Sequence, residues 1–138
     1  MMMKTPLSSK IHYGRILVPY DKSDLSDRAL KHAIYLSKVC GAEIVILNVI
    51  KSDENMQIGN IRKKLDDRVS YCKLEGAIEV SYIIREGKPL NEIVSVLEER
   101  AYDLIVMGSS KISSLQMVRS IARKVIDGIR KPVLIIHD

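Results

Sequence analysis

The chain of 138 residues is the size of one domain and can bury one sizeable core. Hydrophobic residues make up 46% of it and both Trp and Phe are absent, which favours a parallel sheet packed with Ile, Leu and Val over an aromatic-rich binding surface. No apolar stretch approaches the roughly 18 residues of a membrane span, and the first residues lack the apolar core of a signal peptide. We therefore expect a loose tail at 1–13, a single domain at 14–138 and a cytoplasmic location.

Apolar runs and amphipathic stretches alternate along the chain. Short runs rich in Ile, Leu and Val predict strands at 16–18, 44–50, 78–84, 104–107 and 133–136. Apolar residues at helical spacing predict helices at about 24–40, 56–76, 89–101 and 115–129. In the segment 78–84, the residues Ile78, Val80, Tyr82 and Ile84 alternate with Glu79, Ser81 and Ile83, as expected of a half-exposed strand at a sheet edge. Strict alternation of five strands and four helices predicts an α/β fold with an open parallel sheet and helices on both faces.

The helix that follows the first strand has recognisable ends. Ser23 or Asp24 can cap its start, and Gly41 can end it. We expect its core face at Ala29, Ala33, Leu36 and Cys40. Cys40 and Cys72 both occupy apolar positions of helical patterns, with no C-x-x-C pair or Cys/His cluster nearby. Two buried, reduced thiols are therefore expected, and no metal site.

Polar residues and glycine gather after two of the predicted strands. Asp21, Lys22 and Ser23 follow the first strand, and Gly108, Ser109 and Ser110 follow the fourth. Ligands of open α/β sheets bind outside the carboxyl ends of the strands, where the strand order reverses. If these two strands are neighbours, both loops face one crevice, in which a glycine N–H and hydroxyl groups can hold an anion.

Each of these residues also has a purely structural explanation. Asp21 could serve only to cap the first helix, Gly108 could serve only to form a tight turn, and serines are common in turns and caps. The histidines suggest neither a metal site nor a catalytic triad, because they are scattered along the chain at positions 12, 32 and 137. No catalytic residue is therefore assigned.

Four blocks of the sequence resemble the universal stress protein family. They are ILVPYDKSDLSDRALKHA, GAEIVILNVI, EGKPLNEIVSVLEERAYDLIVMGSS and KPVLIIHD, and they cover essentially Arg15 to Asp138. The EGKP…DLIVMGS block is the most specific. The resemblance implies a Rossmann-like sheet of the adenine nucleotide alpha hydrolase type, with strand order 3-2-1-4-5. It also implies a homodimer in which the strands Val133–Ile136 of two subunits pair.

Family members that bind ATP carry Asp at the end of strand one, a hydrophobic residue at the end of strand two, and a phosphate loop of pattern G-x-x-G-x9-G-S/T. Asp21 and Val49 match the first two positions, and Gly108 matches the first glycine. The resemblance thus implies a nucleotide site at these residues, with Ser23 and Ser109 beside them. ATP or AMP is the implied ligand, with Mg²⁺ only if ATP is bound.

The rest of the phosphate loop departs from that pattern. Lys111 stands where the second glycine belongs, and Arg119-Ser120 best matches the closing Gly-Ser, through a loop two residues shorter. A side chain at a position that needs positive φ or close backbone approach costs about 1 kcal/mol or more. Ser113 and Gln116 also fit a capping box, which would place Ser120 inside one continuous helix. We expect a weakened backbone cradle, with the alternative that Lys111 and Arg119 meet phosphate by side-chain charge.

The whole net charge of +5 lies in this last part of the chain. Between 108 and 132 there are six basic residues, against Asp127 as the one acidic residue. The basic residues are Lys111, Arg119, Arg123, Lys124, Arg130 and Lys131. An anionic partner and a solvated helix face explain this segment about equally well. DNA binding is not indicated, because no recognition motif accompanies the charge.

Three functions remain in competition. The first is a non-enzymatic stress-response regulator that acts as a homodimer through partner contacts. The second is an ATP or AMP sensor whose phosphate loop is filled by Lys111 and Arg119. The third is an enzyme of the same broad superfamily, such as a nucleotidyl transferase, but the chain has no HIGH-like sequence, SGG-type loop or Walker A pattern.

Overall fold

A computed structural model describes residues 11–52, 58–108, 116, 119, 123 and 131–137 of the chain. Its elements are β1 (Arg15–Pro19), α1 (Asp24–Cys40), β2 (Glu43–Ile50), α2 (Ile58–Leu74), β3 (Glu79–Glu86), α3 (Pro89–Glu99), β4 (Leu104–Gly108) and β5 (Val133–Ile136). Each predicted strand is present, and three of the four predicted helices are described, the second of them from Ile58 onward. Of the fourth, at 115–129, the described residues are Gln116, Arg119 and Arg123, all helical and exposed.

The five strands form one parallel sheet in the order β3-β2-β1-β4-β5, which confirms the expected Rossmann-like topology. Leu17 of the central strand β1 lies beside Val45 of β2 on one side and Ile105 of β4 on the other. The chain first builds the sheet outward from β1 through β2 and β3, and then crosses to β4 on the opposite side. The strand order therefore reverses between β1 and β4.

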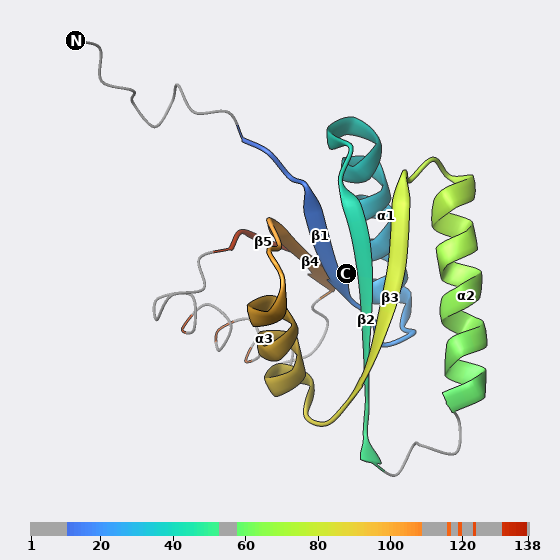
Figure 1. The fold of residues 1–138 in the computed structure, drawn as a ribbon, viewed down its shortest axis with the longest axis vertical. Helices are drawn as coiled ribbons and strands as arrows, with labels where there is room; N and C mark the ends of the chain where they lie inside the picture. The colour runs from blue at the N-terminus through green and yellow to red at the C-terminus, as the bar shows by residue number, and fades with distance from the viewer. Residues whose placement is uncertain are drawn as a thin grey trace.

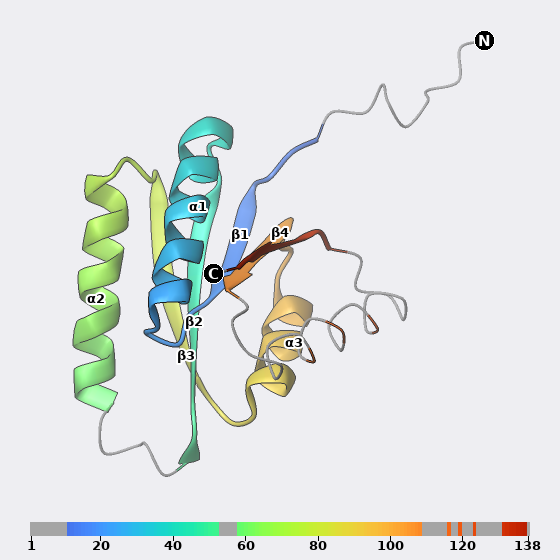
Figure 2. The same cartoon turned by 180° about the vertical axis from the view of Figure 1, so that it is seen from behind.

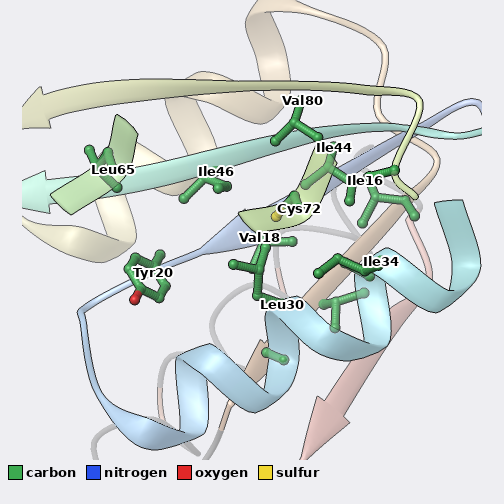
Figure 3. Packing of buried hydrophobic residues seen from close by; sticks show 14 of the residues in the cluster. Ile16, Val18, Tyr20, Leu30, Ile34, Ile44, Ile46, Leu65, Cys72 and Val80 are labelled. Carbon is green, nitrogen blue, oxygen red and sulfur yellow. The ribbon is translucent and has the colours of Figure 1, made fainter. Parts of the chain in front are cut away.

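Helices cover both faces of the sheet, with α1 and α2 on one face and α3 on the other (Figures 1 and 2). Successive residues of a strand point to opposite faces, so Ile16 and Val18 pack under α1 while Leu17 packs under α3. The first of these clusters brings side chains of α1 and α2 against apolar residues of all five strands, and Figure 3 shows part of it. Burial on both faces explains why β2 is apolar almost throughout.

The ends of α1 agree with the prediction, but its core face is rotated from the expected one. Ser23 is the N-cap, and Gly41 adopts a left-handed conformation (φ 74°) and donates its N–H to the Ser37 carbonyl. The buried residues of the helix are Leu25, Ser26, Ala29, Leu30, Ala33, Ile34 and Ser37. Leu36 and Cys40 flank this stripe and are half-buried, so the prediction of a buried Cys40 was wrong, whereas Cys72 is buried as expected.

The two edges of the sheet differ in chemistry. β3 pairs only with β2 in the described chain, as predicted for an edge strand, and it exposes Glu79, Ser81 and Glu86. β5, at the opposite edge, has the sequence VLII, and its Leu134 is 37% exposed. None of the described helices is long and apolar enough to cross a membrane. Tyr13, just before β1, packs against the core, and the division into a tail and a domain at residue 14 stays a prediction.

Candidate functional site

A cleft of about 160 Å³ opens at the carboxyl ends of β1, β2 and β4, beside the start of α3. It lies where the strand order reverses, which is where open α/β sheets bind their ligands. Four of the residues singled out from the sequence line this one cleft: Asp21, Ser23, Val49 and Gly108. Its other lining residues are Pro19, Tyr20, Leu25, Ser26, Leu47, Pro89, Ile93 and Met107.

The carboxylate of Asp21 is held by the first residues of α1. Its Oδ1 atom accepts hydrogen bonds from the backbone N–H of Ser23, at 3.0 Å, and from the hydroxyl of Ser26, at 2.9 Å. Partial burial acts to raise the pKa of Asp21, but the hydrogen bonds from Ser23 and Ser26 outweigh it and leave the pKa below its ordinary value. The cleft therefore presents a fixed negative charge at neutral pH.

Capping of α1 does not account for Asp21. The N-cap is Ser23, whose hydroxyl oxygen accepts the backbone N–H of Ser26 at 3.2 Å. Asp21 lies two residues earlier, and its side chain braces the loop rather than the first turn of the helix. The carboxylate is exposed at the cleft, and the hydrogen bonds found for it in the described chain use Oδ1. The hydrogen bonds to Oδ1 thus also fix the orientation of Oδ2, which accepts neither of them.

Lys22 adopts a left-handed backbone conformation with φ 69°, the one positive φ among the non-glycine residues that the structure describes. Such a conformation costs a residue other than glycine on the order of 1 kcal/mol or more. The hydrogen bonds that Asp21 accepts from Ser23 and Ser26 span this turn and hold it in place. The shape of the loop after β1 therefore depends on side chains, and no sequence pattern singled out this conformation.

The segment between β1 and this loop is fixed to β2. Tyr20 donates its backbone N–H to the Leu47 carbonyl at 2.8 Å and accepts a hydrogen bond from the side-chain amide of Asn48, also at 2.8 Å. Asn48 is 3% exposed, and a buried amide without partners would be costly. Sequence reasoning missed this residue, although its signal was present, because Asn48 is the one polar residue in the apolar run 44–50.

Another part of the cleft lining is an apolar wall. Val49 is half-buried at the end of β2 and packs with the cluster that contains Ile93 of α3 and Met107 of β4. Pro89 at the start of α3 completes this wall, where its missing N–H is tolerated. Ile93 and Met107 were not predicted as site residues, because the sequence does not distinguish an apolar residue that lines a cleft from one that only packs in the core.

Gly108 ends β4 at the rim of the cleft, and glycine is required there for lack of space. A Cβ atom at this position would lie 2.9 Å from Cβ of Leu25 and 3.0 Å from its backbone carbonyl carbon and oxygen. The φ of Gly108 is not positive. Close packing of β4 against α1 is thus a reason for this glycine that the sequence did not indicate.

The phosphate-loop predictions fall mainly on the part of the chain beyond β4. Ser109, Lys111 and Ser120 lie outside the described residues, as does the proposed capping box at Ser113. Arg119 is helical and exposed. Among the residues that the structure does describe, no three or more His, Cys, Asp or Glu are grouped so as to hold a metal ion.

The described cleft thus combines one oriented carboxylate with an apolar wall. A carboxylate accepts hydrogen bonds from hydroxyl or amino groups, and an apolar wall suits the face of a planar ring. In the described part of the lining, the Ser23 hydroxyl donates to Ser26 and the Ser26 hydroxyl donates to the Asp21 carboxylate, and neither serine has a histidine, lysine or cysteine partner. The geometry fits binding of a small molecule that carries both a ring and hydroxyl groups.

Known proteins are similar to this chain in sequence and in architecture. The model of the universal stress protein family matches residues 12–137. Universal stress protein MJ0531 of Methanocaldococcus jannaschii is 30% identical in an alignment that covers 90% of this chain and 82% of that protein.

Solved structures agree with these sequence comparisons. That of MJ0577 from Methanocaldococcus jannaschii superposes with a TM-score of 0.74 and 28% identity, over 93% of this chain and 98% of that one. The structure of the universal stress protein from Archaeoglobus fulgidus in complex with dAMP gives a TM-score of 0.65 and 25% identity, over 91% and 98% of the two chains. With a family match over nearly its whole length and the strand order expected from it, the chain belongs to the universal stress protein family.

Proposed function

We propose that this protein is a non-enzymatic regulator that binds an adenine nucleotide in the cleft at Asp21. The observation that carries the proposal is that Asp21 and Val49, the two family-pattern residues at the ends of β1 and β2, both line one cleft. The complex of the Archaeoglobus fulgidus relative with dAMP supports an adenine nucleotide as the ligand class.

In this proposal the described cleft holds the nucleoside half of the ligand. Its volume of about 160 Å³ is below the roughly 300–1,000 Å³ of common ligand pockets, so part of the ligand extends beyond it. Adenine packs against the apolar wall at Val49, and the carboxylate of Asp21 accepts a hydrogen bond from a ribose hydroxyl. The phosphates then point toward the loop that follows Gly108.

We propose further that the phosphate half relies on side-chain charge. Lys111 and Arg119 replace two loop glycines of the family pattern, with Ser109 and Ser120 beside them. Arg119 is exposed, which supports its availability to an anion. AMP and ATP are both accommodated in this view, and Mg²⁺ accompanies ATP alone.

Subunits are proposed to pair through β5. The strand is apolar, it lies at an open edge of the described sheet, and Leu134 is exposed on it. An unpaired apolar edge strand is a ready template for pairing with a second copy across a two-fold axis.

Titration calorimetry with AMP and ATP tests the nucleotide proposal. Asp21→Asn is expected to weaken binding by about tenfold, since one hydrogen bond to a charged acceptor contributes about 1.5–3 kcal/mol. Asp24→Asn is the matched control, because Asp24 is also exposed in the same segment but does not line the cleft. Absence of binding of both nucleotides at millimolar concentration, or equal loss in both variants, overturns the proposal.

A further inference from the structure

A cluster of three polar side chains joins β1, α1 and α2 behind the cleft. The Tyr20 hydroxyl donates to Oδ1 of Asp27 at 2.6 Å. Nε of Arg68, on α2, donates both to the Tyr20 hydroxyl at 2.7 Å and to Oδ1 of Asp27 at 2.8 Å. A second guanidinium nitrogen of Arg68 lies 3.3 Å from Oδ2 of Asp27. Arg68 thus ties together the end of β1 and the first turn of α1.

Tyr20 separates two hollows of the molecule. It lines the cleft that contains Asp21, while its hydroxyl partners Asp27 and Arg68 line a second hollow of about 440 Å³ between α1 and α2. The ring itself is 3% exposed and belongs to the core under α1, as Figure 3 shows. Arg68 of α2 therefore contacts Tyr20, which lines the cleft, although Arg68 itself does not line it.

Tyr20 is also held at its backbone, so the cluster fixes its far end. The Leu47 carbonyl and the Asn48 amide bind the Tyr20 main chain, and Asp27 with Arg68 binds its hydroxyl. A residue anchored at both ends has little freedom to rotate. The direction in which the next residue, Asp21, leaves β1 follows from this anchorage.

We propose that Arg68 is a positioning residue of the cleft, which acts through Asp27 and Tyr20 to set the place of the Asp21 carboxylate. The inference rests on the proposed function, since it assigns a remote residue to the same site. It extends the site to α2, an element that contributes no lining residue to the described cleft.

Stability alone is a weak reason for this arrangement. The side chains of Arg68 and Asp27 are 26% and 29% exposed, and ion pairs of such exposure contribute little to stability. A planar guanidinium, however, fixes direction as well as distance, because its donors form a rigid fork. Arg68 uses that fork to hold a hydroxyl and a carboxylate at once.

The chain offers a matched control at the other end of the sheet. Arg15 and Glu43 form an ion pair of 2.9 Å, with side chains 25% and 14% exposed, at the amino ends of β1 and β2. Removing Arg15 therefore takes away a comparable ion pair at the end of the strands opposite the cleft. Arg68→Ala and Arg15→Ala separate positioning of the cleft from general loosening of the fold.

AMP binding to the full chain is measured by calorimetry, together with urea unfolding. Arg68→Ala is expected to weaken AMP binding by about three- to thirtyfold, while Arg15→Ala leaves the affinity unchanged. Tyr20→Phe, which removes only the hydroxyl, should weaken AMP binding as well. Because both changes act through the same contact, the double variant Arg68→Ala/Tyr20→Phe should bind AMP no more weakly than the single variant of lower affinity. Affinity that is equal in Arg68→Ala and the natural protein, or equally reduced in Arg15→Ala, overturns the inference.

A second readout needs no ligand. The titration of the Asp21 carboxyl, followed by carbon NMR, is expected to move toward its ordinary range in Arg68→Ala and in Tyr20→Phe, because the carboxylate then leaves its hydrogen-bond donors. An unchanged Asp21 titration in both variants overturns the inference even if the natural protein binds no nucleotide. Failure of nucleotide binding with a shifted Asp21 titration would instead overturn the proposed function and leave the positioning role supported.

Discussion

Gly108 and Leu25 approach each other so closely that a Cβ atom at Gly108 would lie 2.9 Å from Cβ of Leu25. Separations below 3.0 Å do not occur for real Cβ atoms, and two of the three nearest atoms belong to the backbone of α1. Neither partner can rotate away. The first glycine of the phosphate-loop pattern thus also fixes the distance between β4 and α1, which both contribute residues to the lining of the cleft.

Replacement of Gly108 by Ala should destabilise the protein by about 1–3 kcal/mol, the usual cost of overpacking. Gly59→Ala is the matched substitution, because no atom of the described residues lies within 4 Å of a Cβ atom at this position of α2. It should stabilise the protein by about 0.5–1 kcal/mol through helix propensity. Urea unfolding of both variants measures the difference, and equal stabilities would contradict the close contact.

Acid should weaken the fold partly through Asp21. Its pKa is lowered in the folded state, so the ionised carboxylate contributes stability above its ordinary pKa of 3.8, and this contribution is lost as the pH falls through the lowered value. Asp21→Asn removes that contribution at every pH. The difference in unfolding free energy between the natural protein and Asp21→Asn should therefore shrink from pH 5 toward pH 2. A difference independent of pH would show that the hydrogen bonds do not favour the charged form.

Alkali should act through Tyr20. Burial, together with the hydrogen bond to Asp27, raises the pKa of Tyr20 from 10.0 to about 12. The neutral phenol therefore stabilises the fold fully below pH 10, and this stabilisation is lost as the pH rises toward 12. The ultraviolet titration of the native protein should contain a late phenolate step that is missing in Tyr20→Phe. If the step that Tyr20→Phe removes instead lies near the ordinary tyrosine pKa of 10.0, the Tyr20 hydroxyl is in contact with water.

Self-association should depend on β5. Leu134→Lys places a charge on the exposed apolar position of this strand, so light scattering at micromolar concentration should give the mass of a monomer, where the natural protein gives that of a dimer. Ser81→Lys makes the same kind of change on the exposed side of β3 and should leave the mass unchanged. A natural protein that is monomeric would refute pairing through β5.

Binding of ATP should be weak and unusually dependent on salt. Exposed cationic side chains are screened by salt more strongly than a backbone cradle, and Arg119 is exposed. Arg119→Ala should reduce ATP affinity at low salt and flatten its salt dependence, whereas Arg62→Ala, an exposed change on α2, should do neither. Tight, salt-insensitive binding that survives Arg119→Ala would mean that the backbone loop is intact.

The fold followed from the sequence because its signals are local. The run 44–50 is apolar on both faces, as a central parallel strand requires, and Gly41 ends α1 at a left-handed residue that is easily recognised. The core face of α1 was less predictable. A helix with apolar residues on neighbouring stripes can be rotated by tens of degrees about its axis without violating its apolar pattern. Packing against the sheet buries Ile34 and Ser37 and leaves Cys40 half-buried.

The candidate site was predictable at the strand ends and hidden elsewhere. Asp21 and Gly108 stand directly after apolar runs, so the parallel sheet brings them to one edge. Arg68 is 41 positions from Asp27, on a helix with many charges, and nothing in its neighbourhood marks it. Its contact depends on how α1 and α2 pack, which is a property of the assembled fold.

The unequal edges of the sheet also limit how large an assembly can grow. A subunit whose two sheet edges can both pair with other copies can form an open-ended filament. A subunit in which one edge alone can pair makes one symmetric contact, and that contact leaves no edge free for a further copy. β3 carries Glu79 and Glu86 at its two ends, and both are exposed. Their charges oppose the approach of another β3, so if two subunits pair through β5, we do not expect further copies to add at the β3 edge.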